Sequence, residues 1–167
     1  MILGFSTQLN GKPTYFVEKI LIGIDKHLGV YHTELFLKSF EEKFESKPPV
    51  NYDGKLHSIR EDKNDRWHAG MMIDFFINCR QKAMFRFAPV LPVVSVQEVL
   101  MTYYHSDVIQ ISIDGRELFS YTERLEFAIN DGFDNWEDFF NYFYPKIKAA
   151  PKECYTPKLI HWTDLKY

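Results

Sequence analysis

A run of consecutive strand-like segments between residues 55 and 119 constrains the fold of this chain more than any other feature. Most of the segments are apolar or rich in β-branched and aromatic residues, and loop signals rather than helical patterns separate them. They are Lys55–Arg60, Met71–Asn78, Ala83–Ala88, Val93–His105 and Val108–Phe119. Asp114-Gly115 lies between two alternating apolar runs, which is a strong hairpin signal. Strands that follow one another without intervening helices favour a mostly antiparallel sheet or barrel.

Helical periodicity flanks this run on both sides. Two helices are predicted before it, the first beginning after Thr14 and the second carrying Leu35, Phe36, Phe40 and Phe44. After it, Thr122–Asn130 is helical, and a further helix carries Trp136, Phe139, Phe140 and Phe143. The terminal segments Met1–Ser6 and Lys158–Tyr167 have strand character, and their pairing would close the sheet. We therefore predict one α+β domain over residues 1–167.

Composition limits the kinds of function that remain. A chain of 167 residues with 46% hydrophobic and 17% aromatic residues can bury a sizeable core, which excludes a disordered chain. Nonspecific binding to long nucleic-acid duplexes usually needs a basic excess, whereas the net charge here is −3. A role with nucleic acid must therefore depend on a local basic patch or a small pocket.

Neither metal binding nor membrane insertion is expected. The two cysteines, Cys79 and Cys154, and the six scattered histidines show no metal-ligand spacing, so we expect no metal and no cofactor. The apolar N-terminal segment is too short for a signal peptide, and no apolar run approaches the ~18 residues of a membrane span. These features predict a cytoplasmic protein with no membrane partner.

The densest cluster of chemically useful side chains lies in the first strand of the run. Lys55, His57, Ser58 and Arg60 fall within six residues. A desolvated lysine loses its proton readily and can activate a hydroxyl nucleophile such as Ser58, while an arginine can bind phosphate or a carbonyl oxygen. The alternative is a charged edge strand that faces water.

Strand alternation limits how these side chains can meet. It places Lys55 and His57 on one face and Ser58 and Arg60 on the other. Lys55 and Ser58 can converge only if the chain bends near Gly54, and glycine permits such a bend.

Further candidates lie outside this strand. Arg66 and Trp67 follow it closely, and Trp67 or Trp162 could stack on a base, although tryptophan more often packs in a core. Several acids lie near predicted helix ends, where capping is their ordinary role; they are Asp131, Asp134, Glu137 and Asp138.

The segment Gly54-Lys55-Leu56-His57-Ser58-Ile59-Arg60 resembles the signature of the ASCH family, whose outline is Gly-x-Lys-x-x-Thr-x-Arg. Four later segments resemble the family's loop and strand, a later strand, the late helices and the closing strand. They are residues 66–75, 94–99, 127–139 and 160–162. The resemblance covers roughly residues 1–24 and 54–167, so that Asp25–Asp53 looks like a helical insertion.

The resemblance implies a PUA-like β-barrel with flanking helices and a cleft beside the signature. It also implies a set of candidate residues. Lys55, Ser58 and Asp131 match the family's catalytic Lys, Thr and Glu, with Asp131 one methylene shorter than the family's residue. Arg60 matches the family's Arg, and we add His57, Arg66 and Trp67 as candidate ligand-binding residues.

Four functions agree with this pattern. The first is a binding module for RNA or a modified nucleoside. The second is an amidohydrolase of N-acylated cytidines, in which Ser58 attacks, Lys55 takes the proton and Asp131 positions or protonates. The third is a ribonuclease, in which His57 moves protons. The fourth is a partner-binding domain that uses the inserted helix.

Overall fold

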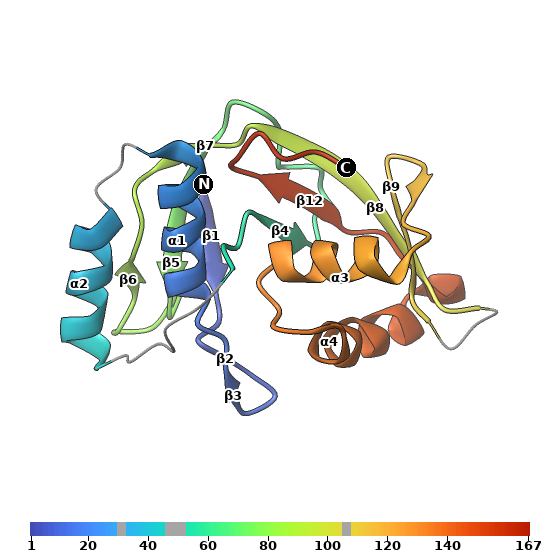
Figure 1. Ribbon diagram of the computed structural model, residues 1–167, viewed down its shortest axis with the longest axis horizontal. Coiled ribbons are helices and arrows are strands. Elements are labelled where there is room, and N and C mark those ends of the chain that lie inside the picture. The colour runs from blue at the N-terminus through green and yellow to red at the C-terminus, as the bar shows by residue number, and fades with distance from the viewer. Residues whose placement is uncertain (30–32, 46–52, 105–107) are drawn as a thin grey trace.

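The strands of the central run are divided between two main sheets (Figure 1). The computed structural model describes residues 1–29, 33–45, 53–104 and 108–167. In the first sheet, β5 (Met72–Ile77) is central and pairs in parallel with β1 (Ile2–Phe5). The short strands β6 (Phe85–Arg86) and β7 (Leu91–Pro92) pair antiparallel with β5.

The second sheet is antiparallel throughout and has the strand order β10-β9-β8-β12-β4, with β11 also paired to β8. The bounds are β4 His57–Arg60, β8 Ser95–Thr102, β9 Gln110–Ile113, β10 Arg116–Glu117, β11 Cys154–Tyr155 and β12 Lys158–His161. The expected Asp114-Gly115 hairpin joins β9 and β10, and both of its residues have positive φ. A separate small hairpin consists of β2 (Gln8–Leu9) and β3 (Lys12–Pro13).

Each sheet has its own helices and its own core (Figure 1). The helix α1 (Phe16–Leu28) contributes to the core of the first sheet, and α2 (Thr33–Phe44) packs beside α1. The second sheet is covered by α3 (Tyr121–Asn130) and α4 (Trp136–Ala149), followed by a short 3-10 turn, Pro151–Glu153. None of the helices in the described part of the chain is both long and apolar enough to cross a membrane.

The α+β prediction is confirmed, but the described sheets do not form the expected closed barrel. Closure required the first and last strands to pair. Instead β12 has β4 on one side and β8 on the other, so both of its edges are already occupied, and β1 pairs with β5. The sheets are joined instead by packing and by side-chain contacts, which include a hydrogen bond from Arg60 of β4 to Gly4 of β1.

Local signals place most helix ends correctly. Gly29 ends α1 in a left-handed conformation, so the proposed insertion 25–53 begins inside α1; residues 30–32 and 46–52 lie outside the described residues. Ser120 and Glu123 form a capping box at the start of α3. Asn135, one of the two caps that the sequence offers for this helix together with Asp134, caps α4 by accepting a hydrogen bond from the backbone N–H of Asp138.

Two glycines bring the candidate site against α1. A Cβ on Gly54 would lie 2.6 Å from the Cα of Gly23, and a Cβ on Gly23 would lie 2.7 Å from the Lys55 carbonyl oxygen. Gly54 has no positive φ. Its role is therefore close approach to a helix rather than the bend that the sequence suggested.

Gly23→Ala should destabilise the protein even though alanine is the better helix former. Helix propensity favours alanine by about 1 kcal/mol. The new methyl group would meet a backbone carbonyl that cannot turn away, and such overpacking costs about 1–3 kcal/mol. We expect a lower urea midpoint for Gly23→Ala and little change for Lys26→Ala on the exposed side of the same helix. A more stable Gly23→Ala protein would contradict this account.

Candidate functional site

The residues just before β4 connect the two halves of the molecule. The backbone N–H of Lys55 donates to the Lys19 carbonyl of α1 at 2.9 Å, and that of Leu56 donates to the Asn130 carbonyl of α3 at 2.8 Å. Lys55 therefore enters the interior between α1 and the end of α3. These two backbone hydrogen bonds fix the main chain at this junction, and so fix the point from which the Lys55 side chain extends.

Lys55 and Asp131 form a buried ion pair. The Lys55 Nζ lies 2.8 Å from Asp131 Oδ1 and also donates to the Asp131 carbonyl oxygen. The same Oδ1 accepts the backbone N–H of Ile59 at 3.0 Å. Lys55 is 1% exposed and Asp131 is 5% exposed. A pair this deep persists only because each charge has a partner and further hydrogen bonds. Asp131 thus does more than end a helix, which was its ordinary interpretation.

Burial and pairing shift the protonation of both groups. Burial lowers the pKa of Lys55 to about 8, although the Asp131 carboxylate opposes the shift. Burial also acts to raise the pKa of Asp131, but the Lys55 ammonium and His57 outweigh it and hold that pKa below its usual value. Asp131 is therefore ionised near neutral pH. Lys55 is mostly charged there and becomes neutral just above.

His57 extends this centre away from Lys55. Its Nδ1 lies 3.6 Å from Asp131 Oδ1, and its Nε2 lies 2.9 Å from the hydroxyl of Tyr167. The ring is fully buried, and burial lowers its pKa. Across the sheet, His57 is opposite His161, whose ring nitrogens have no hydrogen-bond partner among the described residues.

Ser58 and Arg60 do not hydrogen-bond to the ion pair among the described residues, as strand alternation predicts, although the charge of Arg60 acts on Lys55. Ser58 is 3% exposed and opposite Ile160 of β12, and the hydrogen bonds of Lys55 go to Asp131 rather than to Ser58 within the described residues. Arg60 donates to the Gly4 carbonyl at 2.6 Å, and its guanidinium carbon lies 4.8 Å from the centre of the Phe5 ring. The bend that would bring Lys55 and Ser58 together is absent from this part of the structure.

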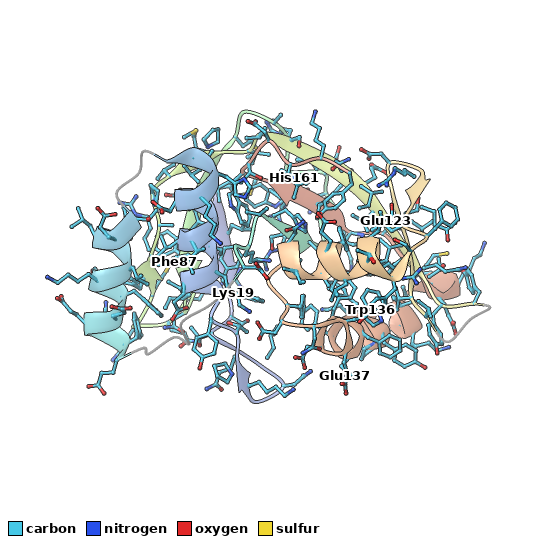
Figure 2. All side chains as sticks on the ribbon, in the orientation of Figure 1. Lys19, Phe87, Glu123, Trp136, Glu137 and His161 are labelled. Carbon is cyan, nitrogen blue, oxygen red and sulfur yellow. The ribbon has the colours of Figure 1, made fainter. Side chains whose placement is uncertain are left out.

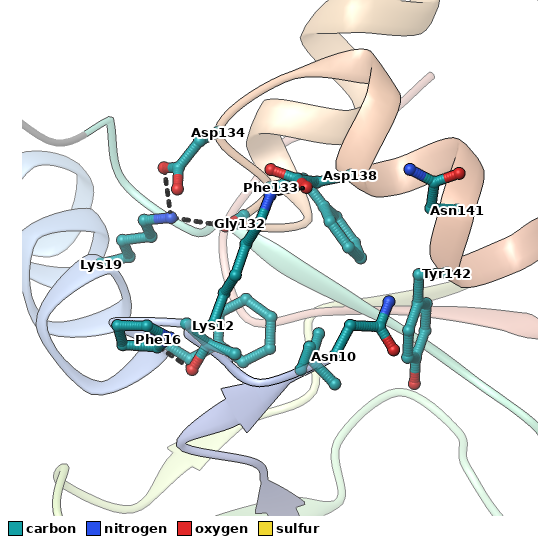
Figure 3. A pocket seen from close by; sticks show the side chains of 13 residues that line it. Asn10, Lys12, Phe16, Lys19, Gly132, Phe133, Asp134, Asp138, Asn141 and Tyr142 are labelled. Atoms are coloured by element: carbon teal, nitrogen blue, oxygen red, sulfur yellow. Dashed lines mark hydrogen bonds and ion pairs between the residues drawn. The ribbon is translucent and has the colours of Figure 1, made fainter.

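A pocket of about 190 Å³ lies beside the ion pair, between the β2–β3 hairpin and α4 (Figure 3). We call it the hairpin pocket. Phe16 and Gly132 line it and also border Lys55, whose Nζ is 4.9 Å from the centre of the Phe16 ring. Its other lining residues are Leu9, Asn10, Lys12, Pro13, Thr14, Lys19, Phe133, Asp134, Asp138, Asn141 and Tyr142. The pocket thus combines flat rings, amides and charges.

Two ion pairs shape the hairpin pocket. Lys19 is 3% exposed and lies on the side of α1 that faces α3 and α4 (Figure 2). It donates to the Gly132 carbonyl at 2.7 Å and contacts Asp134 Oδ1 at 2.6 Å. Lys12 of the hairpin reaches Asp138 of α4 at 3.0 Å (Figure 3). The Lys19–Asp134 pair fixes the loop between α3 and α4 at the base of the pocket. The Lys12–Asp138 pair links the hairpin to α4 across it.

A larger pocket of about 880 Å³ includes Arg60, and we call it the Arg60 pocket. Tyr142 of α4 lines both pockets, so the two adjoin along this helix. Lys63 and Lys146 add positive charge to the Arg60 pocket, and Glu61 and Asp62 add negative charge. The lining is therefore mixed in charge.

Arg66 and Trp67 do not join the centre. Trp67 is 6% exposed and packs in the core of the first sheet, where its backbone N–H donates to Asp62. Arg66 is largely exposed, with its Nε 3.5 Å from Asp62 Oδ1. Trp162, the other stacking candidate, is 1% exposed in the same core.

Sequence reasoning missed Lys19, Phe16, Tyr142 and the two asparagines of the hairpin pocket. Lys19 carried a usable signal, because it stands three residues after Phe16 on the apolar stripe of α1. A lysine on a buried stripe needs an acidic or carbonyl partner. Tyr142 carried none, because an aromatic residue on an aromatic-rich helix is ordinarily part of the core.

Among the described residues, no group of three or more His, Cys, Asp or Glu side chains is arranged to hold a metal ion. Comparison of the chain with protein-family models, with curated proteins and with solved structures finds no match. The geometry of the site therefore carries the functional argument.

Stability should fall as the pH is lowered from about 6.5, because His161 resists protonation in the folded state. Burial and the neighbouring His57 lower the pKa of His161 to about 3. Between pH 6.5 and 3 the unfolded chain binds a proton at this residue and the native state does not, so ΔG of unfolding falls by up to about 1.4 kcal/mol per pH unit.

Urea unfolding between pH 7.5 and 4 measures this slope. His161→Gln should make it shallower, and His68→Gln, at an exposed position, should leave it unchanged. Equal slopes for the His161→Gln and unsubstituted proteins would refute the assignment.

Proposed function

We propose that this chain is an ASCH-like domain that binds a modified nucleoside, free or within single-stranded RNA, in the hairpin pocket. One observation carries the proposal: aromatic rings and amide groups line a small pocket directly beside the buried Lys55–Asp131 pair. Single-stranded nucleic acid is ordinarily recognised by stacking on such rings and by hydrogen bonds to base edges.

The arrangement of the signature-like segments supports the family proposal. Three of the segments that resemble the ASCH family lie on β4, β8 and β12, which are neighbours in one sheet, whereas residues 66–75 lead into β5 of the other sheet. The late helical segment places Asp131 against Lys55. We therefore propose a PUA-like relationship in which the sheet is open rather than closed.

The lining of the hairpin pocket suits one base-sized ring. Phe16, Phe133 and Tyr142 offer flat surfaces, and Asn10 and Asn141 each offer a donor and an acceptor. The volume of about 190 Å³ is below the ~300–1,000 Å³ typical of sites for drug-sized ligands. The adjoining Arg60 pocket would then take the sugar, phosphate or neighbouring nucleotide.

Tyr142→Ala should weaken the binding of N-acetylcytidine or of a short single-stranded RNA. Loss of one stacked ring costs about 1–3 kcal/mol, which is roughly 5- to 150-fold in Kd. Isothermal titration calorimetry measures the change. Tyr144→Ala is the matched control, because Tyr144 is also half-buried on α4 but belongs to a ring cluster with Tyr103 and Phe140. Equal losses in the two variants would argue against a stacking site at Tyr142.

A second function, hydrolysis of an N-acyl group, is favoured by the direct contact between Lys55 and Asp131. In this proposal the neutral Lys55 amine takes a proton from the attacking hydroxyl or water, the acyl carbon–nitrogen bond breaks, and the proton passes to the leaving amine. Asp131 orients the amine. Ser58 supplies the hydroxyl only if it moves to the face that Lys55 occupies, so water is the simpler nucleophile.

Hydrolysis should rise with pH around the Lys55 pKa of about 8, because only the neutral amine accepts a proton. The assay follows release of cytidine and acetate from N-acetylcytidine between pH 6 and 9. Lys55→Arg keeps the positive charge beside Asp131 but has no neutral form, so turnover should be lost while the ligand still binds. Turnover that survives this substitution would remove Lys55 from catalysis. Binding without turnover at any pH would leave the binding function alone.

A further inference from the structure

Tyr167 holds the far side of His57 through a defined hydrogen-bond pattern. The side-chain amide of Asn130 donates to the Tyr167 hydroxyl oxygen at 2.9 Å. The same hydroxyl lies 2.9 Å from His57 Nε2. Its backbone is fixed as well, because the N–H and carbonyl of Tyr167 both meet the side chain of Gln97 on β8 at 3.3 Å. Tyr167 is therefore held in place by hydrogen bonds other than its bond to His57.

The Tyr167 hydroxyl can donate to His57 Nε2 or accept from it, and the Asp131 carboxylate beside Nδ1 favours the first arrangement, in which the proton of His57 is on Nδ1. The hydroxyl oxygen accepts from Asn130, so its single proton is available for His57 Nε2. An imidazole nitrogen that accepts a hydrogen bond carries no proton, and a neutral histidine then carries its proton on the other nitrogen. The buried His57 has a lowered pKa and is neutral at neutral pH. In that tautomer the Nδ1–H faces Asp131 Oδ1 at 3.6 Å, a charge contact longer than a hydrogen bond, and Nδ1 has no hydrogen-bond partner among the described residues.

We propose that Tyr167 is a positioning residue that fixes the tautomer of His57 and so presents the His57 Nδ1–H to Asp131, the partner of Lys55. A line of contacts then runs from Tyr167 through His57 and Asp131 to Lys55. A role of these contacts in catalysis rests on the function proposed above. Their effect on the His57 tautomer and on the pKa of Lys55 does not.

Among the groups around His57 and Lys55, the contacts through Asp131 are the main way in which Tyr167 can affect the protonation of Lys55. His57 faces Asp131, His161, Tyr167 and the ring of Phe127. Besides Asp131, the charged groups that act on Lys55 are Arg60 and Lys19, and both oppose its positive charge. Asp131 is the neighbour that favours the ammonium. A second N–H that faces the Asp131 carboxylate offsets part of its negative charge. Asp131 then raises the pKa of Lys55 less than it would alone.

The tautomer is measured in the unsubstituted protein. Two-bond ¹H–¹⁵N correlations of the imidazole rings report which nitrogen carries the proton, and His57→Gln assigns the His57 signals. We expect the Nδ1–H form of His57 at pH 7. A predominant Nε2–H form in the unsubstituted protein would overturn the proposal.

Tyr167→Phe then tests the effect on Lys55. The variant keeps the ring against His57 and Phe127 but removes the hydroxyl. We expect a mixture of His57 tautomers and a rise in the pKa of Lys55 of up to about half a unit, because the His57 Nδ1–H then shares less of the Asp131 charge across their 3.6 Å contact. Titration of the Lys55 ¹³Cε shift measures it, with Lys55→Arg for assignment.

Asn130→Ala is the matched control within the same cluster. It removes the donor to Tyr167 but keeps the hydroxyl that can donate to His57, so the tautomer and the Lys55 pKa should move less than in Tyr167→Phe. An unchanged Lys55 pKa in Tyr167→Phe, or equal shifts in the two variants, would refute a positioning role. All of these measurements are made without ligand, so failure of nucleoside binding or hydrolysis would be seen separately.

Discussion

The buried pairing of Lys55 with Asp131 is the interaction on which the arrangement of this molecule depends. Lys55 is tied to α1 by its backbone, and Asp131 follows α3 and accepts the Ile59 N–H of β4. Removal of either partner would leave an uncompensated buried charge, which typically costs about 3–5 kcal/mol. The first half of the molecule and the second sheet must therefore meet in one register. Gly23 and Gly54 allow the close approach that this register needs.

The loop between α3 and α4 turns that constraint into a pocket. Asp131 faces Lys55, while the next residues, Gly132 and Asp134, both hold Lys19. Two buried lysines thus hold one short loop from two sides. The loop also supplies Gly132 and Phe133 to the hairpin pocket. The base of the hairpin pocket is therefore held by Lys19 and Lys55, the lysines that also join the two halves. This favours a preformed pocket over one that assembles around a ligand.

Local patterns in the sequence predicted the α+β class, the Asp114-Gly115 hairpin, Lys55 as a candidate and, through the family resemblance, Asp131. Turn chemistry and periodicity act over a few residues, so such features can be read from the chain. The closed barrel was wrong because edge pairing is decided between distant strands: β4 and β8 occupy both edges of β12. The contact of Tyr167 with His57 joins residues 110 apart, and no local signal marks it.

Phe16 and Gly132 are the residues that separate the hairpin pocket from the Lys55 side chain. A Cβ on Gly132 would lie 2.9 Å from both the Lys55 Cδ and the Phe16 ring, and Gly132 has a φ of 93°, so glycine is required there twice over. This leaves only a thin wall between the hairpin pocket and the ion pair. Phe16 and Gly132 thus separate the buried Lys55 amine from the hairpin pocket. The proposed binding function needs no change in this wall, whereas the proposed hydrolysis requires the amine to reach a bound acyl group.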